Sequence, residues 1–146
     1  MQKEANFRLI KHLAFLENEL KDYCIFTSLS WEEYNKDRSK RRDVERWIEN
    51  IINSSIDMAK IILNAEGHPL PDTYKGILEN ISIVECFDSE LMERLSGWIR
   101  LRNIISHENL DIRWLSIKKF ITETQPLFES FYKMVKNYLK SKQDIV

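Results

Sequence analysis

The chain has 146 residues, a length typical of one domain, and we expect residues 1–146 to form a single domain. Its net charge is −1, from 22 basic and 23 acidic side chains, so no overall field draws it to nucleic acid. Two cysteines and three histidines, scattered along the chain, exclude a zinc framework and a disulfide-dense secreted scaffold. No stretch is apolar enough for a membrane span, and the opening Met-Gln-Lys-Glu lacks the core of a signal peptide. We therefore expect a soluble, cytoplasmic protein without membrane association.

The first half of the chain predicts two helices. Apolar residues recur every three or four positions over residues 3–25, a pattern typical of an amphipathic helix. Ser30 and Glu33 form a capping-box signature, which predicts that a second helix begins at Trp31. That helix continues to about residue 66, and its length favours a kink within residues 35–39. A glycine and two prolines directly after it are stop signals.

The second half predicts three more helices, over residues 73–85, 89–106 and 113–141. Asp111 is expected to open the last of them, and Pro126 is expected to kink it, because proline removes a hydrogen bond inside a helix. No alternating strand pattern is present. The sequence therefore predicts an all-α fold, a four- to five-helix up-and-down bundle.

One helix carries an unusual pair of residues. Arg102 follows Leu95 and Trp98 at helical spacing, which predicts a place on the buried face, where arginine is rare unless it is paired. His107 comes five residues later at an expected helix end, and Asn103 directly follows the arginine. A structural interpretation gives Arg102 an ion pair and makes His107 a helix C-cap. A catalytic interpretation gives both Arg102 and His107 a direct role in a reaction.

Three segments resemble a known family. Residues 31–38 with 41–46 look like its long second helix, residues 67–71 with Tyr74 look like its following turn, and residues 96–107 are similar to the region of its motif R-x-x-x-x-H-x-Y. The whole chain thereby resembles the HepT-like proteins of the HEPN superfamily. These are ribonuclease toxins partnered with minimal nucleotidyltransferases of the MntA type.

The resemblance implies a HEPN-like helical domain with a catalytic site at Arg102 and His107, supported by Asn103. Histidine can remove the proton of a ribose 2′-hydroxyl, and the arginine fork suits the charge that develops on phosphorus oxygens. Such cleavage needs no metal and no cofactor. Because each chain offers one motif histidine, base and acid would come from two chains of a homodimer. The expected function is a metal-independent endoribonuclease, the toxin of a toxin–antitoxin pair, acting on RNA and bound by a nucleotidyltransferase antitoxin.

The motif departs from the family at its last position. Where the family has a tyrosine that the partner adenylylates, this chain has Asn109, so no adenylylation site is expected there. The partner would then inhibit by covering the site, which we favour, or by modifying another residue. A different class of function stays open: a non-catalytic bundle that binds nucleotides or docks on a nucleotidyltransferase.

A basic segment opens the second long helix. Residues 36–46 hold six basic and three acidic side chains, among them Arg38, Arg41 and Arg42. Such a segment is typical of a solvated helix start. It is also compatible with an RNA-binding track, because phosphate contacts need only clustered arginine and lysine side chains.

Overall fold

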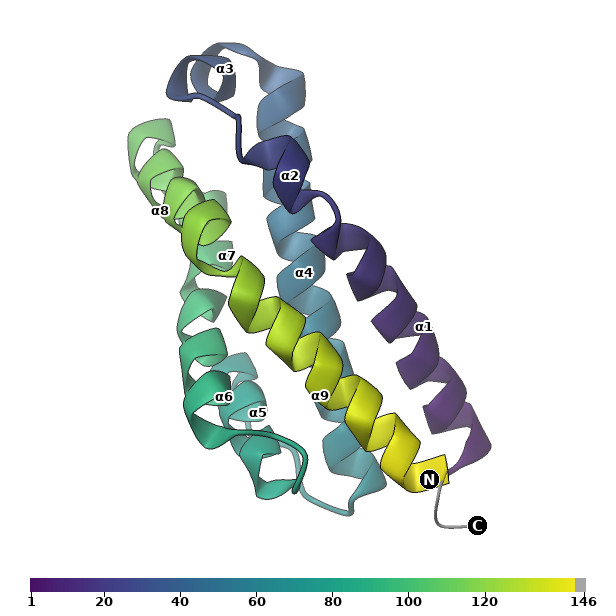
Figure 1. Cartoon of the computed structure of the whole chain (residues 1–146). Coiled ribbons are helices and arrows are strands. Elements are labelled where there is room, and N and C mark those ends of the chain that lie inside the picture. Colours follow the sequence, from purple (N-terminus) through teal and green to yellow (C-terminus); the bar gives the residue numbers. More distant parts are fainter. Residues whose placement is uncertain (144–146) are drawn as a thin grey trace.

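In the computed structural model, which describes residues 1–143, every regular element is a helix. The elements form a bundle in which α1 (Lys3–Leu20) runs alongside α4 (Arg38–Ala65), and α9 (Gln125–Gln143) packs against α1 (Figure 1). The N-terminus and the end of α9 lie at the same end of this bundle. The predicted all-α bundle is confirmed, and residues 144–146 of the expected domain lie outside the described residues.

The first predicted helix is shorter than expected. α1 buries Leu9, Leu13 and Leu16, as its periodicity predicts, but ends at Leu20, and α2 (Tyr23–Phe26) follows as a separate turn. The break lets Tyr23 turn inward, where it is buried and meets the ring of Trp47 edge-on, with centroids 4.7 Å apart. Tertiary packing therefore ends the helix earlier than its local pattern predicts.

The predicted capping box and kink are both present. The Glu33 amide donates to Ser30 Oγ at 3.1 Å, and the Ser30 amide donates to Glu33 Oε1 at 3.2 Å, so α3 begins at the expected residue. α3 (Trp31–Lys36) ends at Asp37, whose extended backbone (φ −98°, ψ 99°) separates it from α4. The Asp37 side chain accepts from the amides of Ser39 and Lys40 and so caps α4.

The long helix α4 forms the centre of the core. Its buried apolar side chains continue along its whole length: Val44, Trp47, Ile48, Ile51, Ile52, Ile56, Met58, Ala59, Ile61, Ile62 and Leu63. The helix stops where the chain reaches Gly67, which has a left-handed φ of +76° that glycine adopts without strain. The stop signal predicted after residue 66 is therefore confirmed.

The predicted helices 73–85 and 89–106 are each interrupted. α5 (Tyr74–Asn80) gives way to a 3₁₀ turn, η1 (Ile81–Ile83). α6 (Ser89–Ser96), capped by Asp88 as predicted, passes through a second 3₁₀ turn, η2 (Gly97–Ile99), into α7 (Arg100–His107). Glycine at the start of η2 lowers helix propensity at the point where the winding tightens.

The last predicted helix begins earlier than expected and is two helices. α8 (Leu110–Glu123) is capped by Asn109, not opened by Asp111. The chain breaks at Thr124, and α9 follows, so the expected kink is displaced toward the N-terminus. Pro126 lies in the first turn of α9, where its missing amide proton costs nothing.

None of the helices within residues 1–143 combines the length and the apolar character that a membrane crossing requires.

Candidate functional site at the turn between α7 and α8

The turn between α7 and α8 presents His107 to solvent. His107 is the last residue of α7, and its side chain is exposed. The next residue, Glu108, leaves the helix with an extended backbone (φ −92°, ψ 163°), while its amide still donates to Ile104 at 3.0 Å. The imidazole therefore projects from a defined helix end that a substrate can approach.

Asn103 shares the exposed face of α7 with His107. The two residues are four positions apart, the spacing that brings side chains onto one side of a helix, and both are exposed. Arg102 and His107 are five positions apart, which separates them by about 140° around the helix axis and about 7.5 Å along it. Within one chain, the motif arginine and histidine therefore lie on different sides of α7.

The expectation that Arg102 is a buried charge is wrong. Arg102 is half-buried, and its guanidinium carbon lies 5.0 Å from the centroid of the Tyr74 ring. In residues 1–143 it forms no ion pair, so the expected structural pairing with an acidic side chain is absent there. The cause is η2, whose tighter winding rotates α7 by about 60° relative to a continuous α-helix and moves Arg102 off the fully buried stripe.

An ion-pair network holds the backbone that follows His107. Arg113 on α8 donates from Nε to the carbonyl oxygen of Glu108 at 2.7 Å, and from Nη1 to Glu45 Oε2 at 3.4 Å. The Tyr34 hydroxyl donates to the same Glu45 oxygen, and burial together with this carboxylate raises the pKa of Tyr34. The network therefore ties the motif turn to α3 and α4.

Asn109, at the family's tyrosine position, is used as a helix cap. Its Oδ1 accepts a hydrogen bond from the amide of Ile112 at 3.2 Å, and its extended backbone is typical of an N-cap. The amide side chain is thus committed to starting α8. This position carries no phenol that could accept an adenylyl group.

The three arginines of the basic segment are not equivalent. Arg38 and Arg42 are exposed at i, i+4 spacing on α4, and both line a shallow cavity of about 720 Å³. Arg41 instead donates to the carbonyl oxygen of Asn35 at 3.3 Å, which ties α4 to α3. The structure therefore brings together Arg38 and Arg42 but gives Arg41 a structural contact.

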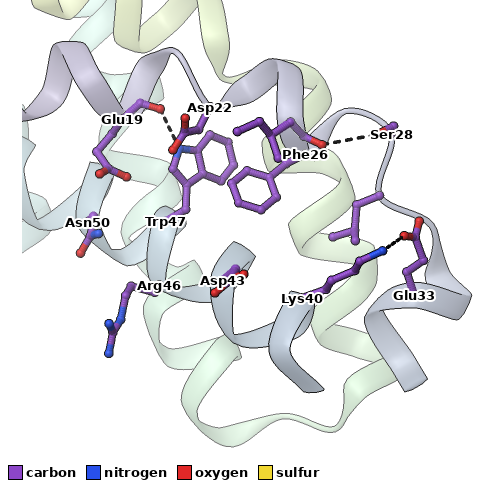
Figure 2. Close-up of a pocket in the computed structure, with 12 residues that line it drawn as sticks. Glu19, Asp22, Phe26, Ser28, Glu33, Lys40, Asp43, Arg46, Trp47 and Asn50 are labelled. Carbon is purple, nitrogen blue, oxygen red and sulfur yellow. Dashed lines mark hydrogen bonds and ion pairs between the residues drawn. The ribbon is translucent and has the colours of Figure 1, made fainter. Parts of the chain in front are cut away.

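A second hollow lies between α1, α2, α3 and α4 (Figure 2). It has a volume of about 580 Å³, and the rings of Phe26 and Trp47 form part of its wall. Trp47 Nε1 donates to the carbonyl oxygen of Glu19 at 2.8 Å, while an ion pair between Lys40 and Glu33 closes the far side. Burial and the neighbouring Asp22 carboxylate raise the pKa of Glu19. None of the motif residues lines this hollow.

Sequence reasoning missed three residues of the site. Tyr74 lay in a segment that carried the family resemblance, but nothing in the sequence linked it to Arg102. Glu45 and Arg113 gave no local signal, because they are 68 positions apart and meet only in the folded chain. In the described part of the chain, no group of three or more His, Cys, Asp or Glu side chains could hold a metal ion.

Comparison with known proteins identifies the family. A family model described as Ribonuclease HepT-like matches residues 16–135, most of the chain. The chain belongs to the HepT-like family. No curated protein matches this HepT-like sequence.

A solved structure has the same fold as this HepT-like chain. It is a tri-AMPylated HEPN toxin from Shewanella oneidensis in complex with an MNT antitoxin. The TM-score is 0.74 with 18% sequence identity, and the match covers 94% of this chain and 99% of that chain. At this identity the likeness establishes the fold, and the predicted HEPN-like architecture is confirmed.

Proposed function

We propose that this HepT-like protein is a metal-independent endoribonuclease, the toxin of a HEPN/nucleotidyltransferase toxin–antitoxin pair, with Arg102 and His107 as catalytic residues. The proposal rests on His107, an exposed histidine at the end of α7, where Arg113 holds the following backbone. Arg102 lies five residues earlier and has no acidic partner within residues 1–143, and the chain belongs to the HepT-like family. Both groups are free to meet an anionic substrate.

His107 acts as the general base. It takes the proton of a ribose 2′-hydroxyl, whose oxygen then attacks the adjacent phosphorus, and general-base catalysis of this kind contributes typically 10²–10⁴-fold. The 5′-oxygen leaves with a proton from a general acid. The products are a 2′,3′-cyclic phosphate and a 5′-hydroxyl, and no step requires a metal ion.

Arg102 stabilises the charge on the phosphorane. A guanidinium donates two parallel hydrogen bonds to phosphate oxygens, and a preorganised donor contributes on the order of 10²–10³-fold. The contact with Tyr74 limits the side-chain freedom of Arg102, so less entropy is lost when the phosphate binds. Asn103, on the same face as His107, supports the reaction by binding a phosphate oxygen.

The active unit is a homodimer. Arg102 and His107 of one chain point to different sides of α7, and the reaction needs an acid as well as a base. Two chains related by a two-fold axis bring two arginines and two histidines to one site. Apolar side chains next to the motif support this arrangement: Ile112 and Leu115 on α8 are 43% and 71% exposed.

Arg38 and Arg42 extend the RNA contact away from the motif. They are exposed on α4, where neutralising phosphates releases counterions and makes binding depend on salt. Replacing both by glutamine should weaken RNA binding and flatten its dependence on salt concentration. Unchanged binding in this double variant would make the segment an ordinary solvated helix start.

The partner is a minimal nucleotidyltransferase antitoxin. The Shewanella protein with this fold was solved in complex with an MNT antitoxin, which supports a partner of the same kind for this chain. The alternative function, a non-catalytic module that binds nucleotides or docks on such an enzyme, is favoured by Asn109, because the motif has lost its last residue.

Growth and cleavage assays separate the two functions. Expression of the wild-type chain should arrest growth, and the purified protein should cut RNA in the presence of EDTA. His107→Ala should abolish both effects without loss of helicity, since its side chain is exposed. His12→Ala, which changes a histidine on α1, is the matched control and should behave as wild type.

Each negative outcome has its own meaning. Cleavage by His107→Ala at the wild-type rate would show that the site lies elsewhere. Strict dependence on a divalent metal would contradict the proposed chemistry. A folded wild-type chain that neither arrests growth nor cuts RNA would establish the non-catalytic module.

A further inference from the structure

Lys60 places a second cation beside the motif arginine. Lys60 Nζ on α4 and the Arg102 guanidinium carbon on α7 each lie 5.0 Å from the centroid of one ring, that of Tyr74. Both cationic side chains are half-buried, while Tyr74, the first residue of α5, is 45% exposed. Three helices that are separate in the sequence therefore bring two positive charges to one exposed ring.

The two charges have no acidic partner. Neither Lys60 nor Arg102 forms an ion pair within residues 1–143. The Tyr74 ring attracts each cation through its π electrons, but it carries no negative charge that could neutralise them. Like charges that share one ring repel each other, and partial burial removes some of the water that would screen them. An anion bound by both would relieve this repulsion, so the cluster is suited to phosphate groups.

Lys60 lies farther from the motif turn than Arg102 does. Glu45 on α4 belongs to the network that holds the backbone after His107. Lys60 follows Glu45 by 15 residues on the same helix, a distance of about 22 Å at 1.5 Å per residue. Figure 1 likewise shows α5 and α8 toward different ends of the bundle. A strand that contacts His107 and Arg102 therefore reaches Lys60 by continuing along the bundle, away from the turn.

We infer that Lys60 and Arg102 form a phosphate-binding subsite for RNA, in which Tyr74 positions both cations. The inference rests on the proposed function. While Arg102 holds the scissile phosphate, Lys60 contacts the neighbouring phosphate of the same strand, on the side away from the motif turn. The Lys60 contact is the same in the ground state and in the transition state, because it does not touch the bond that breaks. It therefore strengthens the binding of RNA without accelerating the chemical step.

A packing role for Lys60 makes a different prediction. A lysine stem can cover an aromatic ring for its apolar contact alone, with the ammonium in water. The chain has a matched example on α9, where Lys136 Nζ lies 5.6 Å from the centroid of the Tyr132 ring. The acidic neighbour of that ring is Glu17. If packing were the whole role, loss of the charge at Lys60 and at Lys136 would affect RNA binding alike, whereas the subsite predicts a difference.

The salt dependence of RNA binding tests the subsite. The full-length protein is titrated with a fluorescent single-stranded RNA that carries 2′-O-methyl groups throughout, so that no 2′-hydroxyl is available for cleavage. Lys60→Met keeps the aliphatic stem over the ring and removes the charge, and its Kd should rise roughly tenfold at low salt. The slope of log binding constant against log salt should become shallower by about 0.7, the value for one phosphate of a single strand. Lys136→Met removes the same charge and should bind as wild type.

Conservative variants separate charge and ring from general damage to the fold. Lys60→Arg keeps the charge and should bind RNA with the wild-type salt slope. Tyr74→Phe keeps the ring and should bind as wild type, whereas Tyr74→Leu removes the common support of both cations and should raise the Kd severalfold. Circular dichroism of every variant checks that the helices are retained. Wild-type affinity in a folded Tyr74→Leu variant would overturn the positioning role of the ring.

Cleavage kinetics separate this inference from the proposed function. With cleavable RNA, Lys60→Met should raise KM roughly tenfold at unchanged kcat, the result of losing an interaction made equally in both states. An unchanged KM and salt slope, or a loss of kcat alone, would overturn the subsite while leaving the ribonuclease intact. A wild-type chain that binds RNA through Lys60 but never cuts it would support the subsite and contradict the enzyme.

Discussion

Arg113 donates a hydrogen bond from Nε to the carbonyl oxygen of Glu108, at 2.7 Å, and Glu108 directly follows the motif residue His107. The same guanidinium reaches Glu45 on α4 at 3.4 Å. The helix end that carries the proposed general base is therefore braced from a neighbouring helix. The position of His107 therefore depends on Arg113, a residue that has no chemical role in the proposed cleavage.

Replacing Arg113 should weaken both the fold and the reaction. Arg113→Met keeps the aliphatic stem but removes both contacts, so the Glu45 carboxylate keeps only the Tyr34 hydroxyl. We expect the free energy of unfolding to fall by about 1–3 kcal/mol and RNA cleavage to fall with it, measured below the unfolding transition. Arg94→Met, which removes an exposed i, i+4 pair with Glu90, should change stability by less than about 0.5 kcal/mol. Equal effects of the two variants would contradict the bracing role.

Tyr23 and Thr124 form a buried pair across 101 positions of sequence, with oxygen atoms 2.6 Å apart. Thr124 Oγ1 also donates to the carbonyl oxygen of Phe120 at 2.7 Å, so the tyrosine hydroxyl is the donor to the threonine. Thr124→Val leaves that hydroxyl buried without a partner, which should cost about 1–3 kcal/mol. The double variant Tyr23→Phe/Thr124→Val removes both polar groups and should be more stable than Thr124→Val alone. Additive losses in urea denaturation would show that the two residues are not coupled.

Glu66 links the ends of α4 and α9 and should make stability depend on acid. The Lys142 ammonium 2.8 Å away holds the pKa of Glu66 below its usual value of 4.5. A carboxyl group whose pKa is lower in the folded state than in the unfolded state stabilises the fold at pH values above its unfolded pKa. This stabilisation is lost as the pH falls through the folded pKa. Wild type should therefore be more stable than Glu66→Gln at about pH 6, and the difference should shrink below about pH 4. Chemical denaturation at both pH values measures it, and a difference independent of pH would contradict the linkage.

Leu115 should control assembly. Leu115 is 71% exposed on α8, close to the motif turn, and Ile112 on the same helix is 43% exposed. Neighbouring exposed apolar side chains of this kind are typical of an interaction surface. We expect wild type to sediment as a dimer and Leu115→Glu as a monomer with reduced cleavage but unchanged helicity. Phe7→Glu is the matched control, because Phe7 is 61% exposed in the first turns of α1, and α1 starts at the other end of the bundle from the α7–α8 turn (Figure 1). A wild-type monomer would contradict the proposed homodimer. A Leu115→Glu variant that still sediments as a dimer would show that the interface lies elsewhere.

The sequence by itself determined the features that depend on neighbours along the chain. The Ser30–Glu33 capping box, the Asp88 cap and the stop at Gly67 all act through hydrogen bonds or backbone angles within a few residues. The amphipathic periodicity likewise required only local spacing, and it was sufficient for the all-α bundle. The motif residues were located in the same way, by their separation on one helix.

Tertiary structure decided what depends on residues far apart. The partial exposure of Arg102 depends on the 3₁₀ turn η2, which rotates α7 about its axis relative to a continuous α-helix. The spacing of apolar residues in the sequence does not reveal this rotation. Tyr74, the neighbour of Arg102, comes from another helix. The Tyr23 hydroxyl is paired with Thr124, 101 positions away, because a buried polar group must find its partner wherever packing brings one. Such partners are chosen by the geometry of the whole core, so no local pattern in the sequence records them.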